Sequence, residues 1–358
     1  GLTPLHQLSA LAATIGAAYP PALTGLRGSN DGSFEAAHKL RDGEKISIDG
    51  LKATERYDLV VVGGGISGLA AAWFYRKRFG ARAKILIVDN HDDFGGHARR
   101  NEFSVDGRTI LGYGGSESFQ SPSHDFSDAV NALLKDLKVD YRRFEKYFDR
   151  GLYPGHRMSR GVFFNREDFK VDKLVTGDPT RMVADDIPAD RMNARAPHLF
   201  IRDMPISDTA KSRLIALYQD QKDVLAGKTV DEKKAYLEKI SYRDYLKRHW
   251  GLDDEAANVF QRRSHDFFAL GIDAVPASFA QETGYPGFKG LQLPADAEAE
   301  AAFEEPYIYH FPDGNASVAR LLVRAMVPGV GAGKTMEDVV TSKFDYAALD
   351  RPRNQVRI

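Results

Sequence analysis

The order of apolar and polar positions divides the chain into an α/β beginning, a helical middle and a mixed end. A short apolar run rich in β-branched residues, 59–62, is typical of a buried parallel strand. A glycine-rich turn follows, residues 69–79 read as a helix, and a second strand over 84–88 ends at Asp89. This order of strand, turn, helix and strand predicts a Rossmann-type α/β domain.

The remaining patterns predict mostly helices. Residues 102–105 and 108–111 flank Asp106-Gly107 as a two-residue hairpin. Further elements are expected as a helix over 125–139, a hairpin within 158–169, helices over 207–225, 231–240, 241–249 and 254–270, a turn at Pro312-Asp313-Gly314, a helix capped by Asn315 that ends at Met326, and a strand from Phe344. With 358 residues, the chain suggests two domains, or one large α/β domain with an inserted lobe.

The glycines after the first strand carry the clearest chemistry. Gly63, Gly65 and Gly68 follow G-x-G-x-x-G spacing, with Ser67 between the last two. In this motif the first glycine permits a tight turn, the second lets the backbone approach a pyrophosphate at the helix N-terminus, and the third lets helix and strand pack closely. Asp89 lies 21 residues after Gly68, the spacing of an acid that accepts ribose hydroxyls. We therefore predict a dinucleotide site.

A glycine pair after the second strand favours a flavin dinucleotide over a nicotinamide one. Many FAD enzymes place a glycine pair and a basic residue here, against the phosphates and ribose, and this chain has Gly95 and Gly96. Arg99 and Arg100 can supply paired hydrogen-bond donors, or either is a solvated arginine on the surface. His97 takes the position where an arginine is commonest.

The segment 112–119, GYGGSESF, is suited to contact with a flat ring system. Gly114, Gly115 and Ser116 would let the backbone press against the ring, and in flavin enzymes of this topology such a segment edges the isoalloxazine. Glu117 is then either a carboxylate that faces the substrate or a solvated acid on a loop.

Composition excludes several classes of protein. The net charge of −1 gives no general attraction for nucleic acid or an anionic membrane. The chain has no cysteine, which excludes disulfides, thiolate catalysis, iron–sulfur clusters and cysteine zinc sites. Residues 295–305 are strongly acidic and form either a solvated face or one that attracts a cation.

The first 55 residues precede the first predicted strand. Residues 2–23 are rich in Ala and Leu but interrupted by prolines, and are either the rest of an export signal or a helix packed on the surface. Ser33 is expected to cap a helix over 34–40 that carries His38. His38, taken alone, reads as an ordinary helix residue, and His265, among aromatic residues, is either a core histidine or a haem ligand.

Several of these segments together resemble one family. VVVGGGISGL, Asp89, GGHARRNEF, GYGGSESF and YHFPDGNASVARLL are similar to the flavin-dependent amine oxidoreductases. The preface YPPALTGLRGSNDGSFEAAHKLRDG resembles that of the bacterial spermidine dehydrogenases among them. The likeness covers nearly the whole chain and implies an α/β, Rossmann-type FAD-binding domain with an inserted, largely helical substrate domain.

The resemblance also implies a reaction. In such enzymes FAD takes a hydride from the carbon next to a secondary amine, so spermidine would give 1,3-diaminopropane and 4-aminobutanal, and the electrons pass to an acceptor other than oxygen. It implies haem b as a second cofactor, with His38 as the expected axial ligand, and export to the periplasm. Carboxylates would hold the ammonium groups of the polyamine. The candidates are Glu117, Glu304, Glu305 and Asp313, and we expect Glu117 and Asp313 in this role.

The resemblance sets the expected domains and the rival functions. We expect a preface at 1–55, the first part of the FAD domain at 56–122, the helical substrate domain at 123–290, and an incomplete return to the FAD domain at 291–358. The rest of the FAD domain would be a C-terminal fragment of the same protein bound as a separate chain. The rivals are another FAD oxidoreductase of this fold, such as an amine oxidase or a desaturase, a nicotinamide-dependent dehydrogenase, and a non-catalytic FAD-binding protein.

Overall fold

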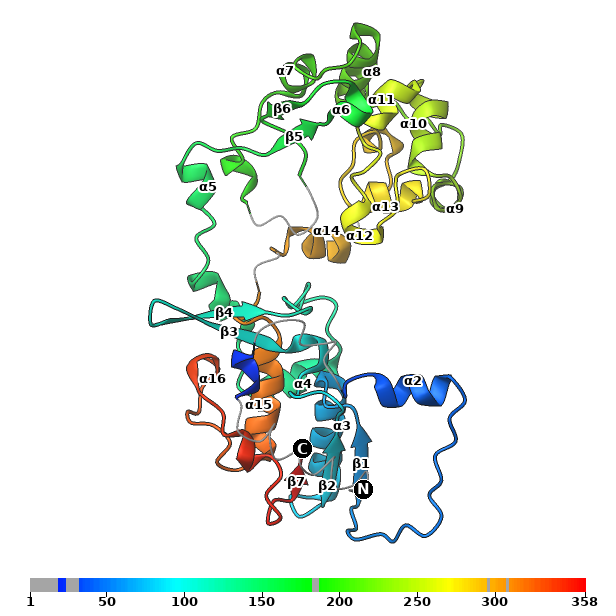
Figure 1. Cartoon of the computed structure of the whole chain (residues 1–358). Coiled ribbons are helices and arrows are strands. Elements are labelled where there is room, and N and C mark those ends of the chain that lie inside the picture. The colour runs from blue at the N-terminus through cyan, green and yellow to red at the C-terminus, as the bar shows by residue number, and fades with distance from the viewer. Residues whose placement is uncertain (1–18, 24–31, 182–186, 295–296, 307–308) are drawn as a thin grey trace. The chain divides into compact units, whose positions relative to one another are not determined.

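The structure is a computed structural model that describes residues 19–23, 32–181, 187–294, 297–306 and 309–358 (Figure 1). The chain is mixed α/β and forms two compact units. The first unit takes in the described residues of 1–120, 126–145 and 308–358, and the second those of 121–125 and 146–307. No helix among the described residues is long and apolar enough to cross a membrane.

A parallel sheet of three strands lies at the centre of the first unit. β1 (Leu59–Val62), β2 (Ile85–Val88) and β7 (Val356–Arg357) follow one another in the order β1-β2-β7. Helix α3 (Ile66–Phe79) connects β1 to β2 and packs against both strands and against α15 (Ala316–Met326), as Figure 1 shows. The predicted strand, turn, helix and strand are confirmed.

An antiparallel hairpin follows β2. β3 (Arg100–Val105) and β4 (Arg108–Tyr113) pair along their whole length. Asp106 and Gly107 have φ of 49° and 76°, the two positive values that a tight hairpin turn of this kind requires. The hairpin is confirmed and is two residues longer on each strand than predicted. The first unit also contains η1 (Pro20–Ala22), α2 (Glu35–Arg41), η2 (Gly96–Ala98), α4 (Asp128–Asp136), η3 (Tyr141–Lys146), α16 (Asp338–Thr341) and η6 (Tyr346–Ala348).

The second unit is mostly helical around one apolar core. Its elements are α5 (Leu152–Gly155), β5 (Gly161–Phe164), α6 (Arg166–Phe169), β6 (Lys173–Thr176), η4 (Ala189–Arg191), α7 (Pro197–Arg202), α8 (Asp208–Gln219), α9 (Val230–Lys239), α10 (Tyr242–Trp250), α11 (Asp254–Asn258), α12 (His265–Phe268), α13 (Ala277–Glu282), η5 (Lys289–Leu291) and α14 (Ala297–Glu304). The Tyr245 hydroxyl and the Trp250 indole both donate to the Gly287 carbonyl, at 2.8 and 3.2 Å, which fixes the loop between α13 and η5 to α10.

Several predicted elements differ from the structure. The helix predicted over 207–225 is wrong at its end, since α8 ends at Gln219. The hairpin within 158–169 is wrong in its second strand, because Asn165 accepts a hydrogen bond from the Asp168 N–H and starts the one-turn helix α6 before β6. The helix predicted over 254–270 is wrong in length, since α11 ends at Asn258 and α12 begins at His265. The strand predicted from Phe344 is replaced by η6, whose start Asp345 caps.

The compact units do not follow the expected boundaries at 122 and 290. α4 belongs to the first unit, and the described residues of 291–307 belong to the second. The apolar stripe of α4 buries Leu133 and Leu134, but helical periodicity alone cannot indicate which unit a stripe packs against.

Candidate dinucleotide-binding site

The turn between β1 and α3 has the geometry of a dinucleotide-binding loop. Gly63 has a φ of 107°, in the region that favours glycine. A Cβ on Gly68 would lie 2.0 Å from the Gly63 carbonyl oxygen, so no side chain fits there. A Cβ on Gly65 would approach only Gly96, at 3.8 Å. Gly63 therefore permits the tight turn, and Gly68 permits close packing of the helix. One face of Gly65 is open.

The N-terminus of α3 offers unpaired donors. The N–H groups of Ile66, Ser67 and Gly68 have no hydrogen-bond partner among the described residues, and Gly65 caps the helix without a side chain. Free N–H groups and the positive end of the helix dipole together favour a phosphate. Ser67 is exposed in this first turn, where a phosphate oxygen could reach its hydroxyl.

Asp89 joins the end of β2 to the glycine loop. The Gly64 N–H donates to Oδ2 at 2.6 Å, and the His91 N–H donates to Oδ1 at 2.9 Å. Burial opposes ionisation of Asp89, but these hydrogen bonds from Gly64 and His91 outweigh it and lower the pKa of the carboxyl. An ionised carboxylate accepts about four hydrogen bonds, so Asp89 keeps acceptor capacity for ribose hydroxyls. Its contact with Gly64 was not predicted from the sequence.

The glycine pair lies against the glycine loop. The Gly95 N–H donates to the Gly64 carbonyl at 2.8 Å. Gly95 and Gly96 have φ of 106° and 59°, and a Cβ on Gly96 would lie 3.2 Å from the Gly65 Cα. A larger residue at Gly96 would therefore separate the two segments, whereas a Cβ on Gly95 would meet the Ala98 carbonyl oxygen at 3.1 Å.

The segment around Gly114 extends the same surface. The Gly115 N–H donates to the His97 carbonyl at 2.9 Å. A Cβ on Gly114 would lie 2.6 Å from the Arg99 carbonyl oxygen. The glycine loop 63–68, the pair 95–96 and residues 114–115 therefore form one continuous surface of backbone, which we call the glycine wall.

A pocket of about 410 Å³ lies on this surface. It is lined by His91, Gly96, His97, Arg99, Asn101, Gly114 and Gly115. Five of these seven residues were predicted as cofactor-binding from the sequence, whereas His91 and Asn101 were not. Pockets of this size are typical of small-molecule sites. The bare helix N-terminus, Asp89 and the glycine wall are the groups that would hold the diphosphate, the ribose and the ring of a dinucleotide such as FAD.

The other predicted side chains near the wall are placed as follows. Ser116 Oγ accepts a hydrogen bond from Asn315 Nδ2 at 2.9 Å. Glu117 is half-buried and accepts a hydrogen bond from the Tyr113 hydroxyl, which raises the pKa of Tyr113. Arg99 Nη1 lies 3.5 Å from Asp92 Oδ1. Glu117 thus follows the glycine wall closely in the sequence, and its carboxylate is partly exposed.

Asp313 does not occupy a position that faces a substrate. Its exposed fraction is 0%, and Arg100 Nη1 lies 3.1 Å from Oδ2 while the Ser317 hydroxyl donates to Oδ1 at 2.6 Å. Burial raises the pKa of Asp313 in spite of these two partners. The expected contact with a polyamine is therefore corrected: Asp313 joins β3 to the start of α15. Sequence reasoning could not distinguish the two roles, because both need an acid at a turn.

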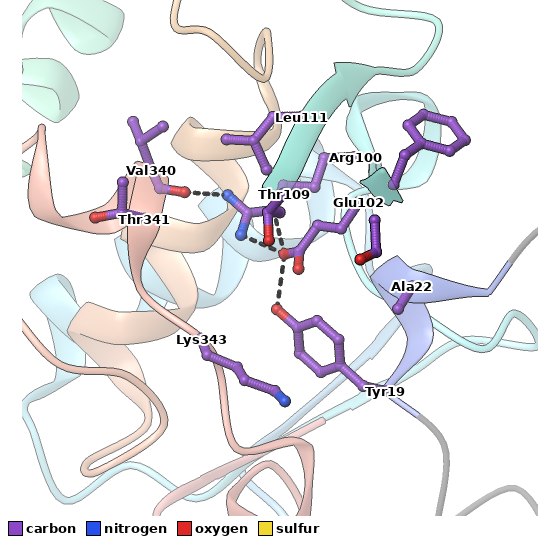
Figure 2. A pocket seen from close by; sticks show the side chains of 11 residues that line it. Tyr19, Ala22, Arg100, Glu102, Thr109, Leu111, Val340, Thr341 and Lys343 are labelled. Carbon is purple, nitrogen blue, oxygen red and sulfur yellow. Dashed lines mark hydrogen bonds and ion pairs between the residues drawn. The ribbon is translucent and has the colours of Figure 1, made fainter. Parts of the chain in front are cut away.

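Arg100 extends this buried network to the surface. Figure 2 shows Arg100, Glu102 and Tyr19 turned toward one another, with Arg100 Nε 3.0 Å from Glu102 Oε1 and the Tyr19 hydroxyl donating to the same oxygen at 2.9 Å. They line a second pocket of about 400 Å³, together with Lys343 and Val340 among others. Of the residues predicted to contact the cofactor, this pocket contains Arg100, whose donors are directed to Glu102, Asp313 and the Val340 carbonyl instead.

His38 lies on α2, no residue of which is buried. Its ring is 5.0 Å from that of Phe34, one residue before the helix. Ser33 does not cap α2, since Phe34 occupies the N-cap position. Among the described residues, no group of three or more His, Asp or Glu side chains could hold a metal ion. Nothing around His38 in the described part of the chain forms the walls that a haem needs.

Residues 61–137 match the NAD(P)-binding Rossmann-like domain family. No curated protein sequence matches the chain. Wild-type putrescine oxidase bound to putrescine is similar at 16% identity over 75% of this chain and 49% of that one, with a TM-score of 0.32. A double mutant of putrescine oxidase gives 18% identity, the same coverage and a TM-score of 0.31. The chain spans about half the length of these structures. The first unit thus contains a Rossmann-like dinucleotide-binding domain.

Proposed function

We propose that the protein is an FAD-dependent oxidoreductase that acts on a polyamine, with spermidine as its substrate. The observation that carries the FAD proposal is the glycine wall. A nicotinamide dinucleotide needs only the first glycine loop and Asp89, whereas the pair 95–96 and residues 114–115 add a flat backbone surface next to that loop.

In this proposal each part of the site binds a different part of FAD. The N-terminus of α3 binds the diphosphate, Asp89 accepts the ribose hydroxyls, and the pocket lined by Gly96, Gly114 and Gly115 takes the ring. Bound FAD would supply the hydride acceptor, so the chain needs only to bind and orient the amine and to exclude water. Glu117, half-buried and hydrogen-bonded to Tyr113, is the carboxylate that we assign to a substrate ammonium.

The choice of an amine rests on the resemblance. α14 carries exposed Glu300 and Glu304, and Glu304 pairs with Arg181 at 2.6 Å, which neutralises part of the acidic stretch. Haem b with His38 as its ligand, electron transfer to a non-oxygen acceptor, a periplasmic location and a bound C-terminal fragment stay predictions that rest on the resemblance alone. An FAD oxidoreductase with another substrate is the alternative.

Anaerobic absorbance spectroscopy tests this proposal. The protein saturated with FAD should lose its oxidised-flavin band when spermidine is added, and 1,3-diaminopropane should appear in the solution. Glu117→Gln should raise the spermidine concentration needed for half-maximal reduction by about tenfold, since one ion pair with the substrate is lost. An unreduced flavin with spermidine, but reduction by another amine or by an apolar substrate, would favour the alternative. A Soret band in the purified protein would support haem, and His38→Ala should remove it.

A further inference from the structure

Asn315 occupies the N-cap position of α15 but does not cap the helix. An asparagine at this position normally accepts a hydrogen bond from an N–H of the first turn through its side-chain oxygen, and no such bond is present here. Instead Nδ2 donates to Ser116 Oγ at 2.9 Å and to the Ser118 carbonyl at 3.3 Å. The side chain therefore joins the start of α15 to the end of the glycine wall.

The backbone around Asn315 makes the same connection. The Asn315 N–H donates to the Ser116 carbonyl at 3.1 Å. Gly314 has a φ of 62°, and a Cβ on it would lie 2.5 Å from the Ser116 carbonyl oxygen and 3.3 Å from the Glu117 Cα. The segments 113–119 and 309–315 thus lie directly against each other, although almost 200 residues separate them in the chain.

The side-chain oxygen and nitrogen of Asn315 differ in their hydrogen bonding. Oδ1, the atom that would cap a helix, is buried and has no hydrogen-bond partner in the described part of the chain. Buried polar atoms are usually paired, so an orphaned one calls for an explanation. The hydrogen bonds that the Asn315 side chain makes with described residues thus run through its N–H donors and not through its oxygen.

We propose that Asn315 is a positioning residue that holds the segment 116–118 in the conformation that faces the flavin-ring half of FAD. The inference rests on the proposed function, and it assigns to Asn315 no contact with the adenosine half, which the glycine loop 63–68 and Asp89 bind. Loss of the two N–H donors should therefore weaken binding of FAD but not binding of ADP.

Asn315→Asp is the decisive variant, because aspartate has nearly the same shape and caps helices as well as asparagine does, but lacks the N–H donors. We expect its affinity for FAD, measured by flavin fluorescence, to fall by about tenfold or more, with a shifted spectrum of the bound flavin. Affinity for ADP, measured by calorimetry, should stay within about twofold. Ser116→Ala, which removes only one acceptor, should weaken FAD binding less.

Asn354→Asp is the matched control. Asn354 Nδ2 also donates to a backbone carbonyl, that of Ala348 at 2.7 Å, in the same unit, and the change should leave both affinities unaltered. Unchanged FAD binding in Asn315→Asp would overturn the inference, and so would an equal loss of FAD and ADP binding, since that would indicate general damage to the domain. A wild-type protein that binds ADP but not FAD would instead overturn the proposed function.

Discussion

At Gly68, a hydrogen atom is the only substituent that fits between α3 and the turn before it. A Cβ there would also lie 3.1 Å from the Val61 side chain, besides its 2.0 Å approach to Gly63. Val61 lies in β1, and Gly63 lies in the turn that follows it. Neither can move without breaking the pairing of β1 with β2. The residue therefore sets how closely the helix N-terminus approaches a bound phosphate.

Gly68→Ala should lower the free energy of unfolding by about 1–3 kcal/mol, since it inserts a methyl group where there is no space. It should also weaken ADP binding, because α3 must move outward. Urea denaturation and calorimetry measure the two effects. Gly155→Ala is the control, as a Cβ on Gly155 meets no atom within 4 Å. Equal stability of Gly68→Ala and Gly155→Ala would contradict the packing described above.

Asp89 should make the stability of the protein depend on pH in the acidic range. Hydrogen bonds from Gly64 and His91 hold the folded-state pKa below the unfolded value of about 3.9. The stability that Asp89 contributes is thus fully present above about pH 4 and is lost as the pH falls through the folded-state pKa. In Asp89→Asn, the free energy of unfolding should change less between about pH 6 and pH 3 than in the wild type. The same pH dependence in both proteins would show that this carboxylate is not held as described.

At the scale of elements, regular patterns were predicted well and contacts between distant segments were not. The glycine turn, the β3–β4 hairpin and α15 follow from local residue types, because φ preferences and apolar periodicity act over a few residues. The break between α11 and α12 was missed, since residues 259–264 contain neither a glycine nor a proline to mark the end of a helix. Asn315 was correctly placed at a helix start, but only the fold could show that its side chain binds residues 116–118 instead of the helix.

Asp313 and Arg100 link two of these elements, β3 and the start of α15. Asp313→Ala should lower the free energy of unfolding by about 3–5 kcal/mol, because it removes a partner of a buried guanidinium. Replacing both residues together, by Arg100→Met and Asp313→Leu, should cost less than the sum of the two single changes. Urea denaturation of the four proteins forms the cycle. Strict additivity would contradict a direct coupling of the two charges.

At the scale of the whole molecule, the Rossmann-like domain and most members of the glycine wall could be predicted from the sequence. The motifs are local, and each was recognised where it stands. The sequence could not show that the pair 95–96 contacts Gly64 and Gly65, or that residues 114–115 continue the same surface, since those contacts join separate segments. Nor could it tell a buried structural acid, Asp313, from an acid that faces a substrate.

The most direct test of the account is a titration of the protein with FAD, NAD and ADP. We predict that FAD binds in a one-to-one complex and that its spectrum changes on binding. ADP should compete with FAD at the glycine loop, and NAD should bind more weakly than FAD. Gly114→Val, which would place a side chain against the Arg99 carbonyl oxygen, should abolish the spectral change while ADP still binds. A protein that binds NAD more tightly than FAD, or a Gly114→Val variant that binds FAD as the wild type does, would contradict the assignment of the glycine wall to a flavin.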